Sequence, residues 1–467
     1  MWLSLRPSRR KTAIVLVLGD VGRSPRMMYH AESLGNDGWE TYLVGYGDTK
    51  PHPALLSNPH IHVLSLLQPP SLFSLLPWVL RAPIRIVYQI MSVLYICLYE
   101  IPFHTEILLV QNPPSIPTLS LAQLVSQISG SRLIIDWHNT GYSILAMRVG
   151  AASPLVKVAA WFERTFGRKA FAHLFVTNAL KAYLVKEWQL EYVVIPIDRS
   201  LAHRNARGLA IVLHDRPPST FKPTDPITKH ELFLHLTPTF SPPLPASILP
   251  STRNSTLFTH VPSTLPLLHP DRPALVVSST SWTADEDFSL LLTALDIYQA
   301  AINAGEHLPR LVVVITGKGA LRAAFERQVV QREIGGWNDV FVRCVFLPTK
   351  DYPTLLGCAD LGVSLHSSSS GRDLPMKVVD MFGSRLPVLA RDFACLHELV
   401  KDGENGRVFQ DGDELGRQLA ELMRDFPNGT ELARLKEYFS HPDKEWSSWE
   451  DNWKRVMRGV IRPRKVE

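Results

Sequence analysis

A loop rich in serine and glycine in the last third of the chain has the residue types that bind anions. It belongs to the segment Ser364–Ala390, SLHSSSSGRDLPMKVVDMFGSRLPVLA, in which a strand is predicted to end near His366. Small residues such as Ser369 and Gly371 let backbone amides approach a ligand closely, and the N-terminal end of the following helix is electropositive. The pattern therefore predicts a site for a diphosphate.

The helix predicted after this loop starts near Asp373 and carries further polar groups. Asp373 and Asp380 are seven positions apart, so both would lie on one face of the helix, with Lys377 four positions after the first aspartate. Lys377 could contact phosphate, and a carboxylate one turn further along could bind a ribose diol. The alternative is an ordinary capped helix with solvated charges.

A carboxylate and an imidazole two residues apart follow a predicted strand in the first half of the chain. They are Asp136 and His138 of the sequence DWHN, directly after the run RLII. In open parallel sheets, ligands bind at the carboxyl ends of the strands. Either side chain could act as a general base toward a hydroxyl nucleophile. A capping aspartate beside a hydrogen-bonded surface histidine would give the same pattern.

A glycine-containing turn follows the first predicted strand. The segment Gly19–Met27 reads GDVGRSPRM, and Gly22 would let backbone amides approach a ligand at the start of a helix, where Arg23 and Arg26 could add positive charge. The spacing is not G-x-G-x-x-G, so a nicotinamide dinucleotide is disfavoured. A simple connection between strand and helix is an equally good interpretation.

Two shorter motifs in the second half each follow a predicted strand, and so fall on the same edge of a parallel sheet. They are Thr280–Phe288, TSWTADEDF, and the turn Gly317–Gly319, GKG. Lys318 could contact phosphate, although a solvated lysine in a turn is as good an interpretation. Both motifs favour the second half as the side that binds a donor.

Apolar runs alternate with longer mixed segments in both halves of the chain, which is typical of parallel βαβ units. Candidate helices include Pro25–Leu34, Pro117–Gln127 and Pro154–Phe166, since a proline suits the first helical turn. The strands predicted in the first half are Ala13–Leu18, Thr41–Val44, Ile61–Leu66, Glu106–Val110, Arg132–Ile135 and His173–Val176. Those predicted in the second half are Ala274–Ser279, Leu311–Thr316, Phe341–Phe346, Leu361–Leu365 and Leu386–Ala390.

The middle of the chain is rich in proline, with thirteen prolines in the 57 residues from 217 to 273. Such a density opposes regular structure and predicts a long loop or linker. We therefore expect an N-terminal Rossmann-like domain over 1–216, this linker over 217–273, and a C-terminal Rossmann-like domain over 274–440. The rest, 441–467, should contain a helix with Trp446, Trp449 and Trp453 on one face, a packing stripe for which the N-terminal domain is one candidate partner.

The bulk composition sets limits on the class of protein. Of the 467 residues, 45% are hydrophobic and 20% are charged, which is globular rather than disordered. A net charge of +5 is small for this length and does not suggest nucleic-acid binding. The four cysteines have no metal-ligand spacing and are expected to be buried, reduced thiols in a cytosolic environment.

The segment 71–103 contains the strongest apolar run of the chain, Ile86–Tyr99. Fourteen residues are short for a bilayer span, which needs about 20. Arginines and prolines lie just upstream, so we expect a helix that lies in or against a membrane surface, with a plain core helix as the alternative.

At these motifs the chain resembles the chitobiosyldiphosphodolichol β-mannosyltransferase family. The matching segments occur in the family's order and cover most of the chain outside the proline-rich middle. They are GDVGRSPRM, DWHNTGYSI, HDRPP at 214–218, TSWTADEDF, HSSSSGRDLPMKVVDMFG and HELVKDGENGRVF at 397–409. The polar stretch Ile195–Gly208 looks inserted relative to the family.

The resemblance implies a GT-B fold, in which two Rossmann-like domains with parallel sheets face a central cleft. It implies GDP-mannose as donor, bound mainly by the C-terminal domain, and dolichol-linked chitobiose diphosphate as acceptor. The place would be the endoplasmic reticulum membrane, at its cytosolic face, with other mannosyltransferases of the pathway as further candidate partners. Family members usually begin with a membrane-spanning helix, whereas this chain has a short basic start, MWLSLRPSRRK.

The resemblance also implies roles for particular residues. The reaction inverts the anomeric centre, so a base must take the acceptor's proton in a single displacement; Asp136 is the first candidate and His138 the second. GT-B enzymes often carry two carboxylates eight positions apart, but Arg372 stands at the first position here, so that only Asp380 matches and Asp373 is a near match. Neither a metal nor a cofactor is expected. The donor-binding set is Gly22, Arg23, Lys318, His366, Ser369, Gly371, Asp373, Lys377, Asp380 and Glu398.

Three other functions remain open at this point. One is a GT-B transferase with another donor, such as UDP-GlcNAc. Another is a catalytically inactive membrane adaptor that holds enzymes of the same pathway. Such an adaptor would have no need for the polar residues of the candidate donor and acceptor sites. The third is a nucleotide-sugar epimerase, which would have no need for the apolar segment Ile86–Tyr99.

Overall fold

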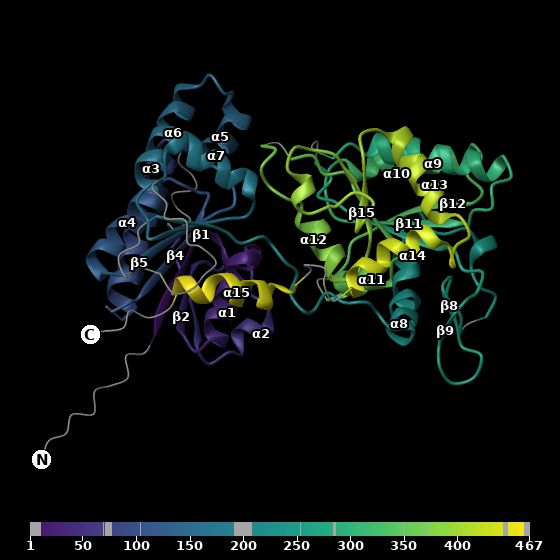
Figure 1. Ribbon diagram of the computed structural model, residues 1–467, viewed down its shortest axis with the longest axis horizontal. Coiled ribbons are helices and arrows are strands. Elements are labelled where there is room, and N and C mark those ends of the chain that lie inside the picture. The colour runs from purple at the N-terminus through teal and green to yellow at the C-terminus, as the bar shows by residue number, and fades with distance from the viewer. Residues whose placement is uncertain are drawn as a thin grey trace, which may run out of the picture. The chain divides into compact units, whose positions relative to one another are not determined.

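The computed structural model describes residues 11–68, 70, 77–102, 104–190, 208–252, 254–283, 286–348, 350–368, 370–441 and 447–461. The chain divides into two compact units, 1–215 together with 449–467, and 216–448 (Figure 1). Ser369, Trp446 and all but the last residue of the stretch Ile195–Gly208 lie outside the described residues.

The N-terminal domain is built on a seven-stranded parallel sheet in the order β3-β2-β1-β4-β5-β6-β7. The chain adds β2 and β3 on one side of β1 and then crosses over to β4, so the topological switch point lies between β1 and β4. The strands are β1 Thr12–Asp20, β2 Glu40–Tyr46, β3 Ile61–Ser65, β4 Ile107–Asn112, β5 Arg132–Trp137, β6 Ala172–Phe175 and β7 Leu209–Val212.

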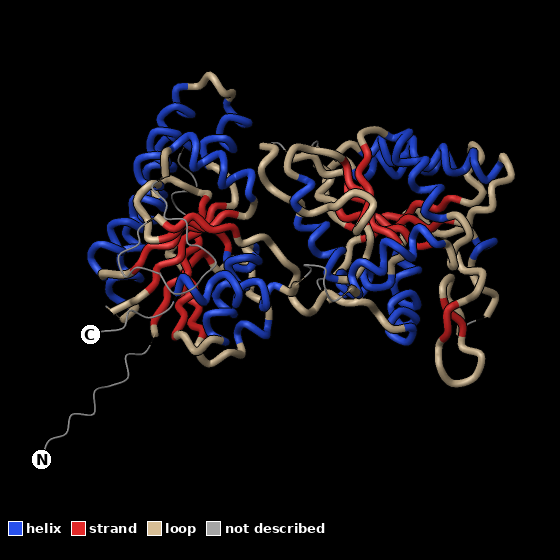
Figure 2. The backbone as a smooth tube through the Cα atoms, viewed as in Figure 1, coloured by secondary structure: helices blue, strands red, loops and turns tan. Residues whose placement is uncertain are grey.

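Both faces of this sheet are covered, which explains the unbroken apolar runs of its strands. In β1, Ala13, Val15 and Val17 pack on one face, and Ile14, Leu16 and Leu18 on the other. Figure 2 shows the strands between helices. The helices are α1 Pro25–Asn36, α2 Pro53–Leu56, α3 Trp78–Tyr95 with the π-helix Ile96–Glu100, α4 Thr118–Ser129, α5 Gly141–Val149, α6 Pro154–Gly167, α7 Asn178–Trp188 and α15 Trp449–Ile461.

The last helix, α15, returns to the N-terminal domain and lies beside α1 (Figure 1). Trp449 and Trp453 are buried there, and the indole N–H of Trp453 donates to Nδ1 of His30 over 3.0 Å. The two tryptophans, four positions apart, thus form a packing stripe as their spacing predicts.

The C-terminal domain has a six-stranded parallel sheet in the order β12-β11-β10-β13-β14-β15, with its switch point between β10 and β13. Its strands are β10 Ala274–Ser279, β11 Leu311–Thr316, β12 Val340–Val345, β13 Leu361–Ser364, β14 Val388–Arg391 and β15 Gly406–Phe409. The helices α9 Phe288–Asn303, α10 Arg322–Ile334, α13 Gly412–Met423 and α14 Thr430–Glu437 pack on one face. On the other face lie α8 Pro226–Leu236, α11 Asp351–Cys358 and α12 Met376–Gly383.

The proline-rich segment 217–273 is not a linker, contrary to the prediction from its composition. It belongs to the C-terminal domain and contains the helix α8 and the two short antiparallel strands β8, Thr259–His260, and β9, Leu267–Leu268. Pro226 occupies the first turn of α8, where its missing N–H costs nothing, and Asp225 caps the helix. Leu232 and Phe233 then enter the core beneath β10.

All eleven strands predicted from the sequence are present, with ends that differ by at most two residues. In the two parallel sheets, the strands not predicted from the sequence are β7 and β15, which have four residues each and lie at the edges of their sheets. Short edge strands bury fewer side chains and therefore have a weaker apolar signal.

The apolar segment 71–103 forms α3 and the π-helix that follows it, within the residues described. Val93, Ile96 and Cys97 pack into the core of the N-terminal domain, whereas Met91 and Tyr99 are exposed. Among the described residues no helix is both long enough and apolar enough to cross a bilayer. All four cysteines are buried free thiols.

Candidate active site

Asp136 lies at the carboxyl end of β5 and is fully buried. Arg26, on the first turn of α1, forms a two-pronged ion pair with it: Nε donates to Oδ2 over 2.8 Å and Nη2 to Oδ1 over 2.9 Å. The remaining Arg26 nitrogen, Nη1, donates to the carboxylate of Asp215 over 2.7 Å and to the carbonyl of Leu213 over 2.9 Å. The buried Arg26 therefore connects α1 with two parts of the chain that are distant in sequence, one around Asp136 and one around Asp215.

The charges of this cluster fix the ionisation of Asp136. Burial alone would raise the pKa of the carboxyl, but Arg26, together with His138 and His30, holds it well below the usual range. In turn, the two carboxylates raise the pKa of Arg26 against the effect of its burial. Asp136 is thus a permanent anion with little affinity for a proton.

His138 is the more accessible partner of the pair. Its Nε2 lies 2.9 Å from Oδ2 of Asp136, and a quarter of its side chain is exposed. Because a carboxylate only accepts, the hydrogen-bonded nitrogen carries the proton, which leaves Nδ1 of a neutral imidazole with a free lone pair. His30, whose pKa is lowered mainly by burial, lies 3.3 Å from the same carboxylate oxygen.

This arrangement does not favour Asp136 as the general base, which was the first candidate from the sequence. Its oxygens are buried and receive hydrogen bonds from Arg26, and its low pKa makes it a weak proton acceptor. The geometry is that of a carboxylate which orients an imidazole and stabilises its protonated form. His138 is therefore the better placed proton acceptor.

A second buried carboxylate, Glu163 of α6, holds the segment that carries His138. It accepts hydrogen bonds from Nδ2 of Asn112 over 2.7 Å and from the backbone N–H groups of Gly141 and Tyr142 over 2.9 and 3.2 Å. The carbonyl of Asn112 in turn accepts from the N–H of His138 over 2.9 Å. The backbone around His138 is thus tied to both β4 and α6.

Gly22 and Arg23 lie in the N-terminal domain, in a single turn of 3-10 helix after β1, whereas the other predicted donor residues belong to the C-terminal domain. A Cβ on Gly22 would approach the carbonyl oxygen of Thr49 to 2.4 Å, so the close packing of that loop requires glycine. The Arg23 side chain is 81% exposed and lies 3.5 Å from the carboxylate of Asp20.

In the C-terminal domain, a cavity of about 280 Å³ opens at the carboxyl ends of β10, β11 and β12. This is the edge of the sheet at which the sequence motifs were expected to meet. Hydroxyl groups predominate in its lining, together with one cation and two apolar side chains. The lining residues are Ser279, Thr280, Ser281, Thr316, Phe346, Leu347, Tyr352 and Lys377.

Lys377 is the cation of this cavity, and a buried glutamate holds it there. Nζ of Lys377 donates to Oε1 of Glu286, which is 4% exposed. The other oxygen of Glu286 accepts from the hydroxyl of Thr280 over 2.5 Å and from the N–H of Ser281 over 3.3 Å. Residues of the motif TSWTADEDF therefore hydrogen-bond to one another, and its Glu286 positions Lys377 of α12.

The turn Gly317–Gly319 packs directly on the same loop. A Cβ on Gly317, whose φ is +148°, would lie 1.8 Å from the carbonyl oxygen of Thr280, so only glycine fits this position. The indole N–H of Trp282 donates to the carbonyl of Gly317 over 3.3 Å. The neighbouring Lys318 places Nζ 3.7 Å from the ring centroid of the half-exposed Phe346, at the rim of the cavity.

Asp380 of α12 lies beside the cavity-lining residue Tyr352. The hydroxyl of Tyr352 is 3.5 Å from its Oδ2 and 3.1 Å from the hydroxyl of Ser279. Burial, aided by Asp380, raises the pKa of Tyr352 far above its usual value, so the phenol stays protonated. Ser279, Tyr352 and Asp380 thus form a chain of polar groups.

Asp373 does not lie on the same helical face as Asp380, contrary to the prediction. The helix α12 begins at Met376, because Pro375 disfavours helical backbone in the residue before it. Asp373 instead closes the serine loop, where its carboxylate accepts from the hydroxyls of Ser368 and Ser370.

The other predicted donor residues surround this loop. Gly371 has a φ of +65° and its N–H donates to Ser368 over 2.8 Å. His366 follows β13 and forms an isolated bridge with Glu286. Glu398 lies in the single-turn 3-10 helix Leu396–Glu398; burial, with Glu398 and Asp373 nearby, raises the pKa of Cys395 to about 12.

Three groups at these sites were not among the residues singled out from the sequence. The sequence indicates Arg26 only as additional positive charge, and Asp215 and Glu286 appear only within longer motifs. The presence of an arginine and of carboxylates in these motifs was the signal that could have identified them as site residues. Their partners, however, lie 110, 189 and 91 positions away, which sequence spacing does not reveal.

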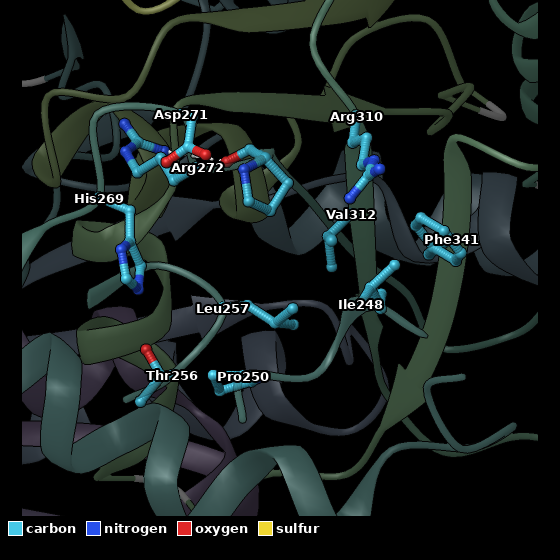
Figure 3. A pocket seen from close by; sticks show the side chains of 11 residues that line it. Ile248, Pro250, Thr256, Leu257, His269, Asp271, Arg272, Arg310, Val312 and Phe341 are labelled. Atoms are coloured by element: carbon cyan, nitrogen blue, oxygen red, sulfur yellow. Dashed lines mark hydrogen bonds between the residues drawn. The ribbon is translucent and has the colours of Figure 1, made fainter. Parts of the chain in front are cut away.

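A second cavity, of about 220 Å³, lies in the C-terminal domain, at the opposite edge of its sheet (Figure 3). Arg310 and Pro273, which directly precede β11 and β10, contribute to its wall. Arg272, also in the wall, is already paired with Asp360 through two hydrogen bonds of 2.7 Å. Ligands of parallel sheets bind at carboxyl ends, so the cavity beside Lys377 is the candidate site. Within the described ranges no group of three or more His, Cys, Asp or Glu side chains could hold a metal ion.

Two doubly wound α/β domains, with polar sites at the carboxyl edges of their strands, define a glycosyltransferase of the GT-B fold. Residues 273–425 match the family model "Glycosyl transferases group 1". Sucrose-phosphate synthase from Thermosynechococcus elongatus has the same fold, with a TM-score of 0.59 and 12% identity over 97% of this chain and 98% of that one.

Relatives of much higher similarity fix the family within this class. The chain is 42% identical to chitobiosyldiphosphodolichol beta-mannosyltransferase of Pongo abelii, over 98% of this chain and 94% of the relative. It is 41% identical to the Homo sapiens protein of the same name, with the same coverage. The chain therefore belongs to the chitobiosyldiphosphodolichol beta-mannosyltransferase family, as the motifs indicated.

Proposed function

We propose that the protein transfers mannose from GDP-mannose to the terminal GlcNAc of chitobiose linked to dolichol diphosphate, and forms a β-1,4 linkage. The observation that carries this proposal is the similarity to relatives of that name over nearly the whole chain. The pairing of His138 with a buried, permanently ionised Asp136 supports it, because an attacking hydroxyl needs a proton acceptor.

The reaction is a single displacement. The acceptor hydroxyl oxygen attacks the anomeric carbon of mannose while Nδ1 of His138 takes its proton, and the bond from that carbon to the diphosphate oxygen breaks. GDP leaves with the electron pair of that bond. The negative Asp136 stabilises the imidazolium that forms, as a carboxylate does beside a catalytic histidine.

The donor side of the proposal uses the cavity of the C-terminal domain. Lys377 and the hydroxyl groups that line the cavity bind the diphosphate, where each well-placed donor contributes about 3 kcal/mol toward the developing charge. Asp380 binds the ribose diol. No metal is needed in this scheme, because Lys377 and the hydroxyl donors of the cavity stabilise the negative charge of the leaving group.

The proposed place of action is the cytosolic face of the endoplasmic reticulum membrane, where a lipid-linked acceptor is available. Exposed apolar side chains on α3, such as Met91 and Tyr95, support contact with a membrane. Other mannosyltransferases that act on the same lipid are proposed as neighbours there.

The direct test supplies the purified protein with GDP-mannose and a phytanyl-linked chitobiose diphosphate. The expected product carries one additional mannose, released by a β-mannosidase and resistant to an α-mannosidase. Turnover should persist after EDTA treatment, and UDP-GlcNAc should not replace the donor. Transfer from UDP-GlcNAc alone, or no transfer from either donor, would contradict the proposal.

A further inference from the structure

The helix α6 is amphipathic in an unusual sense, because its outward face is apolar. Leu155, Val158 and Trp161 recur at every third position, on one face of the helix, and are 62%, 57% and 63% exposed. The opposite face is buried in the domain through Val156 and Ala159. Three large apolar side chains that lie next to one another and are exposed to solvent indicate a surface that binds a partner.

The neighbouring helices extend this apolar surface. Met147 and Val149 are exposed at the end of α5, which packs on α6 and forms a hairpin with it at one extremity of the domain (Figure 1). On the other side α6 contacts α4, where Leu124 and Ile128 are exposed, and α4 contacts α3. The exposed apolar groups therefore belong to one continuous layer of helices.

Basic residues surround the apolar groups of the hairpin. From 141 to 169 the chain has five basic residues and a single acidic one, Glu163. Glu163 is buried, so the charge that reaches the solvent is positive. Lys157 and Arg164 lie on α6 and Arg148 on α5, and all three are exposed. Lysine is depleted in protein interfaces, whereas tryptophan flanked by basic residues is typical of helices that lie on anionic membranes.

The inner face of the same helix holds the segment that carries His138. Glu163 accepts from the N–H groups of Gly141 and Tyr142 and from the side chain of Asn112, whose carbonyl accepts from the N–H of His138. One helix thus has an apolar, basic outer face and an inner face that fixes the backbone beside the candidate base.

We propose that the α5–α6 hairpin docks on the surface of an anionic lipid bilayer and thereby presents the His138 segment to the headgroup of a lipid-linked acceptor. Docking follows from the surface alone. The presentation of an acceptor rests on the proposed function.

Docking is tested by flotation of the full chain with vesicles of phosphatidylcholine, with and without phosphatidylinositol. The wild-type protein should bind the anionic vesicles more tightly. The triple variant Leu155→Ser/Val158→Ser/Trp161→Ser should partition at least roughly tenfold more weakly, because it loses the inserted apolar area. Lys157→Glu/Arg164→Glu should lose about tenfold on anionic vesicles only.

The matched control is Leu321→Ser/Val330→Ser/Ile334→Ser, which removes three exposed apolar side chains at α10 of the C-terminal domain. It should bind vesicles as the wild type does, and all variants should keep the wild-type melting temperature. A triple α6 variant that still floats like the wild type would overturn the proposal. So would sedimentation in the absence of vesicles that shows a dimer which this variant converts to a monomer.

Presentation of the acceptor is tested by turnover of the phytanyl-linked acceptor in detergent and on anionic vesicles. Vesicles should stimulate the wild type and the α10 control but not the α6 variant, whose turnover in detergent should be unchanged. Equal stimulation of the α6 variant would refute the second half of the proposal. Because flotation requires no turnover, a failure of the proposed function would leave the docking result intact and recognisable.

Discussion

Nε2 of His138 lies 2.9 Å from Oδ2 of Asp136, and the aspartate is fully buried while the imidazole reaches the surface. The two side chains have different functions, because Arg26 keeps the buried carboxylate ionised, whereas the more exposed imidazole is the group that can take a proton.

Replacement of His138 by alanine should lower kcat by at least about 100-fold, the usual contribution of a general base. GDP affinity should stay unchanged, since the proposed contact of His138 is with the acceptor hydroxyl and not with the nucleotide. Steady-state kinetics and calorimetric titration with GDP measure the two effects. A variant that keeps a tenth of the wild-type kcat would exclude His138 as the base.

Asp136→Asn should destabilise the N-terminal domain as well as reduce turnover. Removal of one partner of a buried ion pair costs about 3 kcal/mol, near the low end of the usual range because Arg26 keeps Asp215. Urea denaturation measures the loss. The control is Asp37→Asn, whose exposed pair with Arg458 should be worth less than about 1 kcal/mol. Equal effects of the two substitutions would argue against the buried cluster as a source of stability.

Lys377→Met should weaken GDP binding by about tenfold or more, since a hydrogen bond to a charged group contributes about 1.5–3 kcal/mol. The substitution also leaves the buried Glu286 without its cation. The double variant Lys377→Met/Glu286→Gln removes that complication and should bind GDP as weakly. Lys401→Ala, at an exposed position, is the control. Wild-type affinity in the double variant would refute a phosphate contact by Lys377.

Asp380→Ala should reduce GDP affinity about tenfold but leave the affinity for pyrophosphate unchanged, because the proposed contact is with the ribose. Competition of each ligand with a fluorescent GDP analogue provides the measurement. The exposed Asp413→Ala serves as the control. A parallel loss of both affinities would place Asp380 in the support of the cavity through Tyr352 rather than at the ribose.

Glu32 should make stability depend on pH. Burial, with Glu450 nearby on α15, raises its pKa to about 7 from an ordinary value of 4.5. The folded protein then binds this proton more tightly than the unfolded chain, so the free energy of unfolding falls as the pH rises from about 4.5 to about 7. Glu32→Gln should therefore raise Tm at pH 8 relative to the wild type and hardly change it at pH 5. Glu40→Gln should show no such gain, because hydrogen bonds from His60 and His62 lower the pKa of Glu40.

The sequence by itself determined the alternation of strands and helices, the two Rossmann-like halves, the family and the strand ends at which the polar motifs lie. These are local properties, since a strand that is buried on both faces is recognisable as a run of apolar residues. The polar motif at the end of such a strand follows within a few residues. The start of α12 is also encoded locally, because Pro375 directly precedes its first residue. The sequence-based prediction nevertheless placed the start of this helix three residues too early.

Only the tertiary structure decided which side chains meet. Arg26, Asp136 and Asp215 are far apart in the chain, and the ion pair that Arg26 forms with Asp136 in the folded domain decides that Asp136 is a fixed anion rather than a base. The tertiary structure also decided the place of the proline-rich segment, whose composition predicts a linker. The buried side chains of Leu232 and Phe233 make this segment part of the core of the C-terminal domain. Proton affinity and burial depend on neighbours that the chain brings together only on folding, and spacing along the sequence does not encode them.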